Sequence, residues 1–184
     1  MKPTLTLLAE PRWRSQQQLR RAQVSDPLRD WLLEPGSLTR RLRSCCAGQF
    51  QVRVLDQGLQ RPQRGEAKAL HRPAHELTLV RQVLLCCGEQ PWVYARTVIP
   101  LPSLQGGLQA LTRLGNRPLG ELLFADPSMQ RSPIEVAPLR GLLPAPLSRQ
   151  DSAGSWGRRS VFTLWGRPLL VSEFFLPALW QTHP

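Results

Sequence analysis

Two charged residues interrupt apolar faces of predicted β-strands. Side chains alternate across a strand, so residues two positions apart share a face. In the segment 76–87, Arg81 lies in the middle of a face whose other members are apolar. In the segment 168–176, Glu173 lies on an otherwise apolar face, and the opposite face is largely apolar as well. This pattern is typical of strands well inside a sheet, with an ionisable group in the interior.

An unpaired ion in an apolar interior is costly, so such groups are usually paired or used. One interpretation is structural: Arg81 and Glu173 pair with each other, or a strand end or bulge places one of them in water. The other is functional: both line an enclosed cavity. Arg81 would then hold a carboxylate through a bidentate fork, and Glu173 would contact a hydroxyl or move a proton. The pattern alone leaves both open.

Other catalytic chemistries lack the residues they need. His71 and His75 fall in an irregular stretch and His183 at the chain end, which does not support a Ser–His–acid arrangement or a histidine metal site. The sequence contains no GxGxxG, Walker A or HExxH motif. Cys86 or Cys87 could serve as a nucleophile, but no base is set beside them. We therefore expect an enzyme of this sequence to work without a metal or cofactor.

The four cysteines form two adjacent pairs, Cys45-Cys46 and Cys86-Cys87, without C-x-x-C spacing. No apolar run approaches the ~18 residues of a membrane span, and the N-terminus has no signal-peptide pattern. These features favour a cytoplasmic protein. Since neighbouring cysteines rarely bridge each other, we expect all four to be reduced and mostly buried.

The chain is strongly basic, with 24 Lys and Arg against 13 Asp and Glu and a formal charge of +11. An arginine-rich solvated surface would explain this excess, as would nucleic-acid binding. Against nucleic acid, the arginines are scattered and no zinc finger or basic recognition helix is present. A third explanation is a small anionic substrate, for which one or two interior arginines suffice.

The 184 residues fit one domain. We expect an N-terminal arm over 1–24 that is loosely held, and one folded unit over 25–184. Asp26 is the expected N-cap of a helix that ends near Leu33, and Ser37 that of a second helix. The segments expected to be strands are 49–56, 76–87, 92–99, 131–137, 158–165 and 168–176.

Hairpin turns join the segments 76–87 and 92–99 at Gly88, and the last two strands at Gly166-Arg167. Residues 103–124 look helical in two pieces, and residues 57–75 read as a long irregular surface connection. Six strands joined largely by hairpins, with a few helices, predict a single α+β domain. Its sheet should be antiparallel, with the helices packed on it.

Four stretches together resemble one known family, the chorismate lyases (chorismate pyruvate-lyases). They keep their order and spacing over most of the chain from residue 25 onward. They are WLLEPGSLTRRL at 31–42, LVRQVLLCCGEQPWVYARTVIP at 79–100, LGNRPLGELLF at 114–124 and WGRRSVFTLWGRPLLVSEFFLPA at 156–178. The resemblance implies a six-stranded antiparallel sheet with helical flaps over an internal ligand site, and a monomer.

The residues that bind product in that family fall on matching positions. Arg81 looks like the carboxylate-binding arginine, and Glu173 looks like the glutamate near the ring hydroxyl. Leu119 matches a backbone contact. Leu38 falls where the family has methionine, a departure that matters little for a main-chain contact but could reshape the pocket. Arg96 is a weaker candidate for a second substrate carboxylate, its alternative being a surface arginine.

The resemblance implies conversion of chorismate to 4-hydroxybenzoate and pyruvate, a cofactor-free elimination that opens ubiquinone biosynthesis. An enclosed apolar pocket with one arginine would suit the product almost as well as the substrate, so we expect product inhibition. We expect no nucleic acid as a partner and no membrane span. The alternatives are a non-catalytic small-carboxylate-binding module of the same fold and a basic nucleic-acid-binding protein.

Overall fold

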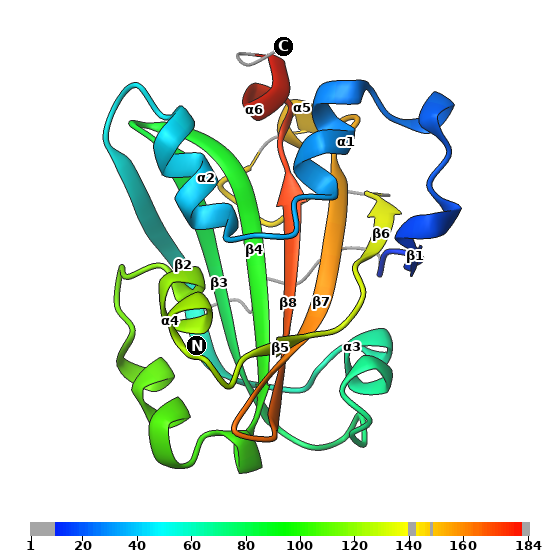
Figure 1. The fold of residues 1–184 in the computed structure, drawn as a ribbon. Helices are drawn as coiled ribbons and strands as arrows, with labels where there is room; N and C mark the ends of the chain where they lie inside the picture. The colour runs from blue at the N-terminus through cyan, green and yellow to red at the C-terminus, as the bar shows by residue number, and fades with distance from the viewer. Residues whose placement is uncertain (1–9, 140–142, 148, 182–184) are drawn as a thin grey trace.

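A computed structural model describes residues 10–139, 143–147 and 149–181, and an eight-stranded antiparallel sheet forms their centre (Figure 1). The strand order is β1-β6-β7-β8-β4-β3-β2, and β5 pairs with β7. The strands are β1 (Arg14–Ser15), β2 (Phe50–Gln60), β3 (Thr78–Cys87), β4 (Gln90–Pro100), β5 (Gln130–Arg131), β6 (Glu135–Pro138), β7 (Trp156–Leu164) and β8 (Arg167–Phe175).

The sheet has more strands than the six predicted. The six predicted segments all contain a strand, and the antiparallel arrangement is confirmed. The two additional strands, β1 and β5, have two residues each. Such short strands are missed because two residues cannot show an alternation of side chains.

The register of the central strands aligns residues across the sheet. Arg81 of β3 pairs in register with Thr97 of β4. Thr97 in turn pairs with Val171 of β8, and Val171 pairs with Ser160 of β7. Val83, Ala95, Glu173 and Arg158 form the neighbouring row on the same face in the same way. The two hairpins β3–β4 and β7–β8 therefore meet along the β4–β8 pairing.

The α-helices are short and lie around the sheet. They are α1 (Asp26–Leu32), α2 (Leu38–Cys45), α3 (Arg64–Ala69), α4 (Leu119–Ala125), α5 (Arg149–Ser152) and α6 (Pro177–Gln181). The 3-10 helices are η1 (Gln16–Gln18), η2 (Arg21–Gln23), η3 (Leu101–Ser103) and η4 (Gly106–Arg113). The segment predicted as two helical pieces over 103–124 thus contains η4 and α4.

Serine caps begin the first two α-helices. Ser37 accepts a hydrogen bond from the backbone N–H of Arg40, which confirms the predicted cap of α2. Ser25, and not Asp26, caps α1 by accepting from the N–H of Leu28. A side-chain oxygen at this position satisfies an N–H group that has no partner inside the helix.

The two faces of the sheet are covered by different elements. Helices α1 and α2 pack on one part of the first face, in the cluster that includes Leu32, Leu42 and Val93. Segments η4 and α4 pack on another part of it, around Leu111 and Leu123. Leu70, which follows α3, packs on the opposite face. Figure 1 shows α2 and α4 in front of the strands and α3 to one side.

Two segments expected to be irregular or loose are ordered. Within 57–75, β2 continues to Gln60 and α3 follows, begun by a capping box of Gln63 and Glu66. The described part of the N-terminal arm is attached to the sheet, since β1 pairs with β6 and Leu19 is buried in the core.

The structure joins Cys46 to Cys87 in a disulfide, so the expectation of four reduced thiols is wrong for these two. Cys46 follows the last turn of α2 and Cys87 ends β3, so the bridge links two elements and one member of each adjacent pair. Cys45 and Cys86 are free thiols, and burial raises the pKa of Cys86.

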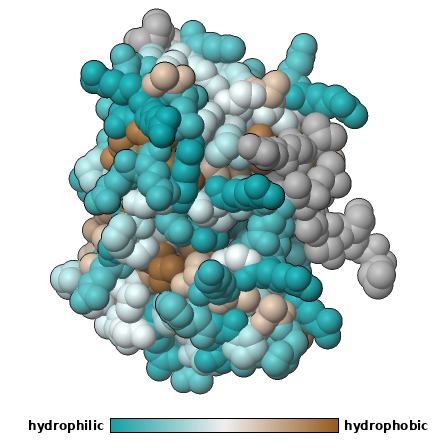
Figure 2. Space-filling model, turned by 90° about the vertical axis from the view of Figure 1, so that its right-hand side faces the viewer, coloured by the Kyte–Doolittle hydropathy of each residue, from teal (hydrophilic) through white to brown (hydrophobic). Residues whose placement is uncertain are grey.

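On the side where β1 and α3 lie, hydrophilic side chains dominate and apolar ones appear in separate patches (Figure 2). Within the described ranges, no helix combines the length and the apolar character that crossing a membrane requires. His183 lies outside the described residues.

Candidate active site

A pocket lies between the sheet and the two helices α2 and α4. It contains about 590 Å³ of space not filled by atoms, part of it open to solvent. The sequence-predicted residues Arg81, Glu173, Leu38 and Leu119 all line it. The rest of the lining is mainly apolar or small, and consists of Gly36, Thr39, Val52, Val83, Leu85, Ala95, Thr97, Pro118, Gly120, Leu123, Phe124, Phe162 and Val171, with Arg131 and Arg158.

Arg81 is buried, 5% exposed, and among the described residues its hydrogen bonds go to neutral groups. Its Nη1 donates to Oε1 of Gln57 at 2.9 Å, and its Nη2 donates to the carbonyl of Gly115 at 2.7 Å. Burial lowers the pKa of Arg81 because the charged form loses hydration. Arg81 is therefore a guanidinium that is held in position, within the described part of the chain, by neutral groups and by no carboxylate.

Glu173 pairs with Arg158 and not with Arg81, so the interpretation in which Arg81 and Glu173 pair is wrong. The Nε of Arg158 donates to Oε2 of Glu173 at 2.6 Å. Arg158 is almost fully buried, and its Nη1 also donates to the backbone carbonyl of Glu34 at 2.7 Å. The carboxylate is thus fixed from one side while it lines the pocket from the other.

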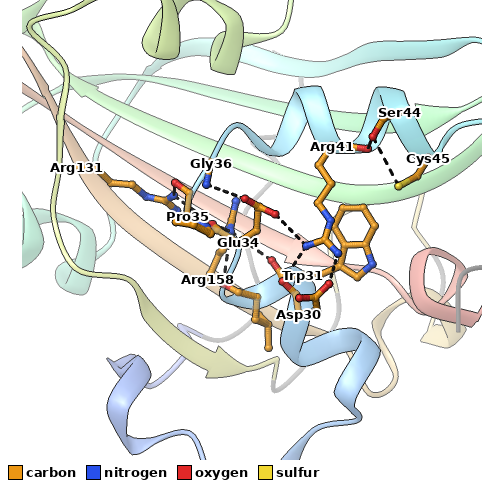
Figure 3. Close-up of polar contacts among 11 residues, drawn as sticks. Asp30, Trp31, Glu34, Pro35, Gly36, Arg41, Ser44, Cys45, Arg131 and Arg158 are labelled. Carbon is orange, nitrogen blue, oxygen red and sulfur yellow. Dashed lines mark hydrogen bonds and ion pairs between the residues drawn. The ribbon is translucent and has the colours of Figure 1, made fainter.

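Arg131 is a third cation at this pocket. Its Nε donates to the hydroxyl of Ser160 at 3.1 Å, and its Nη1 donates to the carbonyl of Pro35 at 3.1 Å. Figure 3 shows Arg131 and Arg158 approaching the 34–36 segment. Burial, and next the charge of Arg158, lower the pKa of Arg131 to about 10.

The charges of the pocket do not balance. Three guanidinium groups, those of Arg81, Arg131 and Arg158, face one carboxylate, that of Glu173, which leaves a formal charge of +2. The Arg158–Glu173 pair accounts for one charge of each sign. Among the described residues, Arg81 and Arg131 form no direct ion pair, although the charges of Glu173 and Glu34 favour the charged form of Arg131 from farther away. A mainly apolar pocket with two such cations suits a small dianion.

Arg96, the weaker candidate, does not line this pocket. Its neighbours Ala95 and Thr97 do, so alternation places Arg96 on the opposite face of β4. It is not a surface residue either, because it is 2% exposed and donates to both carboxylate oxygens of Glu66, at 2.7 and 3.2 Å. Burial alone would lower the pKa of Arg96, but the hydrogen bond and charge of Glu66 raise it.

Helices α2 and α4 meet closely above the pocket. A Cβ added at Gly120 would lie 2.9 Å from Oγ1 of Thr39, so the contact leaves no room for a larger residue. Outside this contact, Arg43 and Glu121 form an ion pair at 2.6 Å on the surface.

Arg131 and Arg158 were missed in the sequence. Because 22 of the 24 basic residues are arginine, one more arginine near a strand end carries no signal. In the described part of the chain, no group of three or more His, Cys, Asp and Glu side chains could hold a metal ion.

Fold and pocket define an α+β protein whose sheet carries a cationic, mainly apolar pocket. Comparison with known proteins gives the family. The family model described as "Chorismate lyase" matches residues 7–183. A "Probable chorismate pyruvate-lyase" of Methylococcus capsulatus is 46% identical over 83% of this chain and 96% of its own length. A protein with the same description from Pseudomonas aeruginosa is 43% identical over 86% of this chain and 88% of its own length. The chain belongs to the chorismate lyase family.

Among solved structures, the ligand-binding domain of a putative GntR-family transcriptional regulator from Bordetella bronchiseptica is 20% identical. It covers 71% of this chain and 86% of its own length, with a TM-score of 0.48.

Proposed function

We propose that this protein is a chorismate pyruvate-lyase. Chorismate loses the hydrogen at ring C4, and the C3–oxygen bond breaks with its electrons on the ether oxygen. The products are aromatic 4-hydroxybenzoate and enolpyruvate, which takes up a proton to become pyruvate. The observation that carries the proposal is a cationic, mainly apolar pocket in a member of this family. Aromatisation drives the reaction, so the protein must mainly position the substrate and exclude water.

Arg81 is the proposed anchor of the ring carboxylate. Its guanidinium is held by neutral acceptors, so it can accept an anion without first breaking an ion pair. Leu38 and Leu119 line the same pocket from α2 and α4 and are proposed to contact the ligand through their main chain. The arginine and the two helices would thus hold the ring between them.

Glu173 is the proposed group that meets the C4 hydroxyl and handles the proton. Its carboxylate is oriented by Arg158, so one oxygen is fixed by the 2.6 Å bond while the side chain remains 16% exposed. A positioned carboxylate beside the reacting carbon is suited to general base work. Arg158 acts through Glu173 as a positioning residue.

The biological setting follows from the same proposal. The reaction would supply 4-hydroxybenzoate for ubiquinone biosynthesis, in the cytoplasm and by a monomer. A pocket that fits the aromatic product almost as well as the substrate should release it slowly, so we expect 4-hydroxybenzoate to inhibit. Progress curves with added product test this, and a rate that is indifferent to excess product contradicts it.

The decisive experiment is incubation of the purified protein with chorismate, without added metal or nucleotide. We expect pyruvate and 4-hydroxybenzoate in equal amounts, and no slowing by EDTA. Binding of chorismate without release of pyruvate would instead indicate a non-catalytic carboxylate-binding module. No interaction with chorismate, together with salt-sensitive binding to nucleic acid, would favour the basic nucleic-acid-binding alternative.

A further inference from the structure

One row of paired residues runs below the pocket, with an arginine at one end and, at the other, a serine that accepts a hydrogen bond from a second arginine. The row runs from Arg81 through Thr97 and Val171 to Ser160, over the adjacent strands β3, β4, β8 and β7. Arg131 adjoins the far end, because its Nε donates to the hydroxyl of Ser160. Three strand spacings separate the backbones of Arg81 and Ser160, roughly 14 Å. The side chains of Arg81 and Arg131 thus line the pocket from opposite sides.

The two arginines share a second property. Both are held by neutral acceptors, Arg131 by the Ser160 hydroxyl and by the backbone carbonyls of Glu34 and Pro35. Arg158, which lines the same pocket, has its charge balanced by Glu173. The pocket therefore offers two separate positions for an anionic group.

We propose that Arg131 binds the enolpyruvyl carboxylate of the substrate, while Arg81 binds the ring carboxylate. This inference rests on the proposed function. The ring carboxylate persists in the product, but the enolpyruvyl carboxylate leaves with pyruvate. Arg131 therefore distinguishes substrate from product, whereas Arg81 binds both. Negative charge also grows on the departing enolpyruvate as the C3–oxygen bond breaks, and a fixed cation beside it stabilises that charge.

A purely structural role for Arg131 is the competing explanation. Arg131 holds the 34–36 segment, and under this explanation its sole role is to support the start of α2, which lies over the pocket (Figure 3). The two roles differ in what they affect. Loss of a purely structural support would weaken the affinity for every ligand equally. Loss of a carboxylate-binding residue would weaken the affinity only for ligands that carry the second carboxylate.

The test uses two unreactive aromatic ligands that differ in this group. 3-(Carboxymethoxy)-4-hydroxybenzoate carries the ring carboxylate, the ether and a second carboxylate, and 3-methoxy-4-hydroxybenzoate lacks only the second carboxylate. Their dissociation constants are measured by calorimetry on the wild-type protein, Arg131→Gln, Arg131→Lys and Arg81→Ala. Arg53→Gln is the control, since it removes one positive charge from a surface pair with Glu89.

We expect wild-type protein to prefer the dicarboxylate roughly 10- to 100-fold, the range of a charge-assisted hydrogen bond. Arg131→Gln should abolish the preference. The dissociation constant of the methoxy ligand should stay within about twofold of the wild-type value, because this ligand lacks the carboxylate that Arg131 binds. Arg131→Lys should restore part of the preference, because it keeps the charge but not the planar fork. Arg81→Ala should weaken both ligands alike, and Arg53→Gln should weaken neither.

Three results would overturn the inference: no preference in the wild type, a preference that survives Arg131→Gln, or equal loss of both ligands in that variant. The wild-type comparison stands even if the variant fails to fold. Failure of the proposed function is detected in a different experiment, in which the wild-type protein releases no pyruvate from chorismate. Such a protein would still reveal by its preference whether Arg131 recognises the second carboxylate.

Discussion

On the pocket face of the sheet, Arg81 donates to a carboxamide and a carbonyl, whereas on the opposite face Arg96 donates to both oxygens of Glu66. The two arginines lie on adjacent strands and are both at least 95% buried. Burial and residue type are thus the same, and only the partners differ. A buried arginine indicates a ligand when its partners are neutral and it lines a pocket, and indicates structure when its charge is paired with a buried carboxylate.

The same comparison applies to the two glutamates that pair with buried arginines. Glu173 lines the pocket and pairs with Arg158, and Glu66 is enclosed with Arg96 on the opposite face. If the difference between the faces is functional, loss of either carboxylate should lower stability, but only the substitution on the pocket face should also lower kcat.

The largest effect is expected from Glu173→Gln. The amide keeps the shape of the side chain but removes its charge and basicity, so kcat should fall roughly 100-fold or more, with a smaller change in KM. Steady-state kinetics with chorismate measure both constants. A variant with near wild-type kcat and lower thermal stability would show that Glu173 is only the structural partner of Arg158.

Glu66→Gln should have the largest effect on stability. It leaves the Arg96 charge buried without a carboxylate, which should lower the free energy of unfolding by about 3–5 kcal/mol. Urea denaturation measures this loss, and kcat of the folded protein should not change. Glu89→Gln, in an exposed pair with Arg53, is the control and should change stability little. A large fall in kcat for Glu66→Gln would mean that the opposite face also takes part in catalysis.

Cys46→Ser should cause the next largest loss of stability. The bridge to Cys87 closes a sequence separation of 41 residues, so its loss should cost about 2–4 kcal/mol of stability. Denaturation with and without reductant should show the same difference in wild-type protein. Cys45→Ser, which replaces the neighbouring free thiol, is the control. Titration of four free thiols in unreduced, unfolded protein would contradict this prediction.

The smallest effect is expected from Gly120→Ala, at the contact between the helices above the pocket. The added methyl group would meet Oγ1 of Thr39 at 2.9 Å and push α2 and α4 apart, at a cost of about 1 kcal/mol. Affinity for 4-hydroxybenzoate should fall several-fold. Adding Thr39→Ala removes the closest atom and should restore most of it. Unchanged affinity in the single variant would show that this contact does not shape the site.

Alternation of side chains located the strands that build the site. It found Arg81 and Glu173 because β3 and β8 are long and regular near those residues. It ended the first strand too early, since a register shift between Val54 and Asp56 interrupts the alternation while β2 continues to Gln60. Helix α3 follows a proline, contains Gly65 and has Gln63 as its N-cap, which is not one of the residue types that mark a helix start, so it was missed.

What the sequence could not supply is the choice of partners. Nothing local distinguishes Arg81 from Arg96, because their partners Gln57 and Glu66 lie 24 and 30 residues away along the chain. The disulfide likewise depends on the meeting of α2 with the end of β3. Arg131 reaches the pocket only through the pairing of β5 with β7.

The pairing of β4 with β8 also has a consequence for folding. The hairpins β3–β4 and β7–β8 are each local in sequence and can form early, but one contributes Arg81 and the other Glu173 and Arg158. Joining them closes the long chain between Pro100 and Trp156, a step slowed by loop entropy. No earlier species contains the complete pocket. Ligand therefore binds only after this step, and at about 100 times its Kd it should add about 2.7 kcal/mol to the free energy of unfolding.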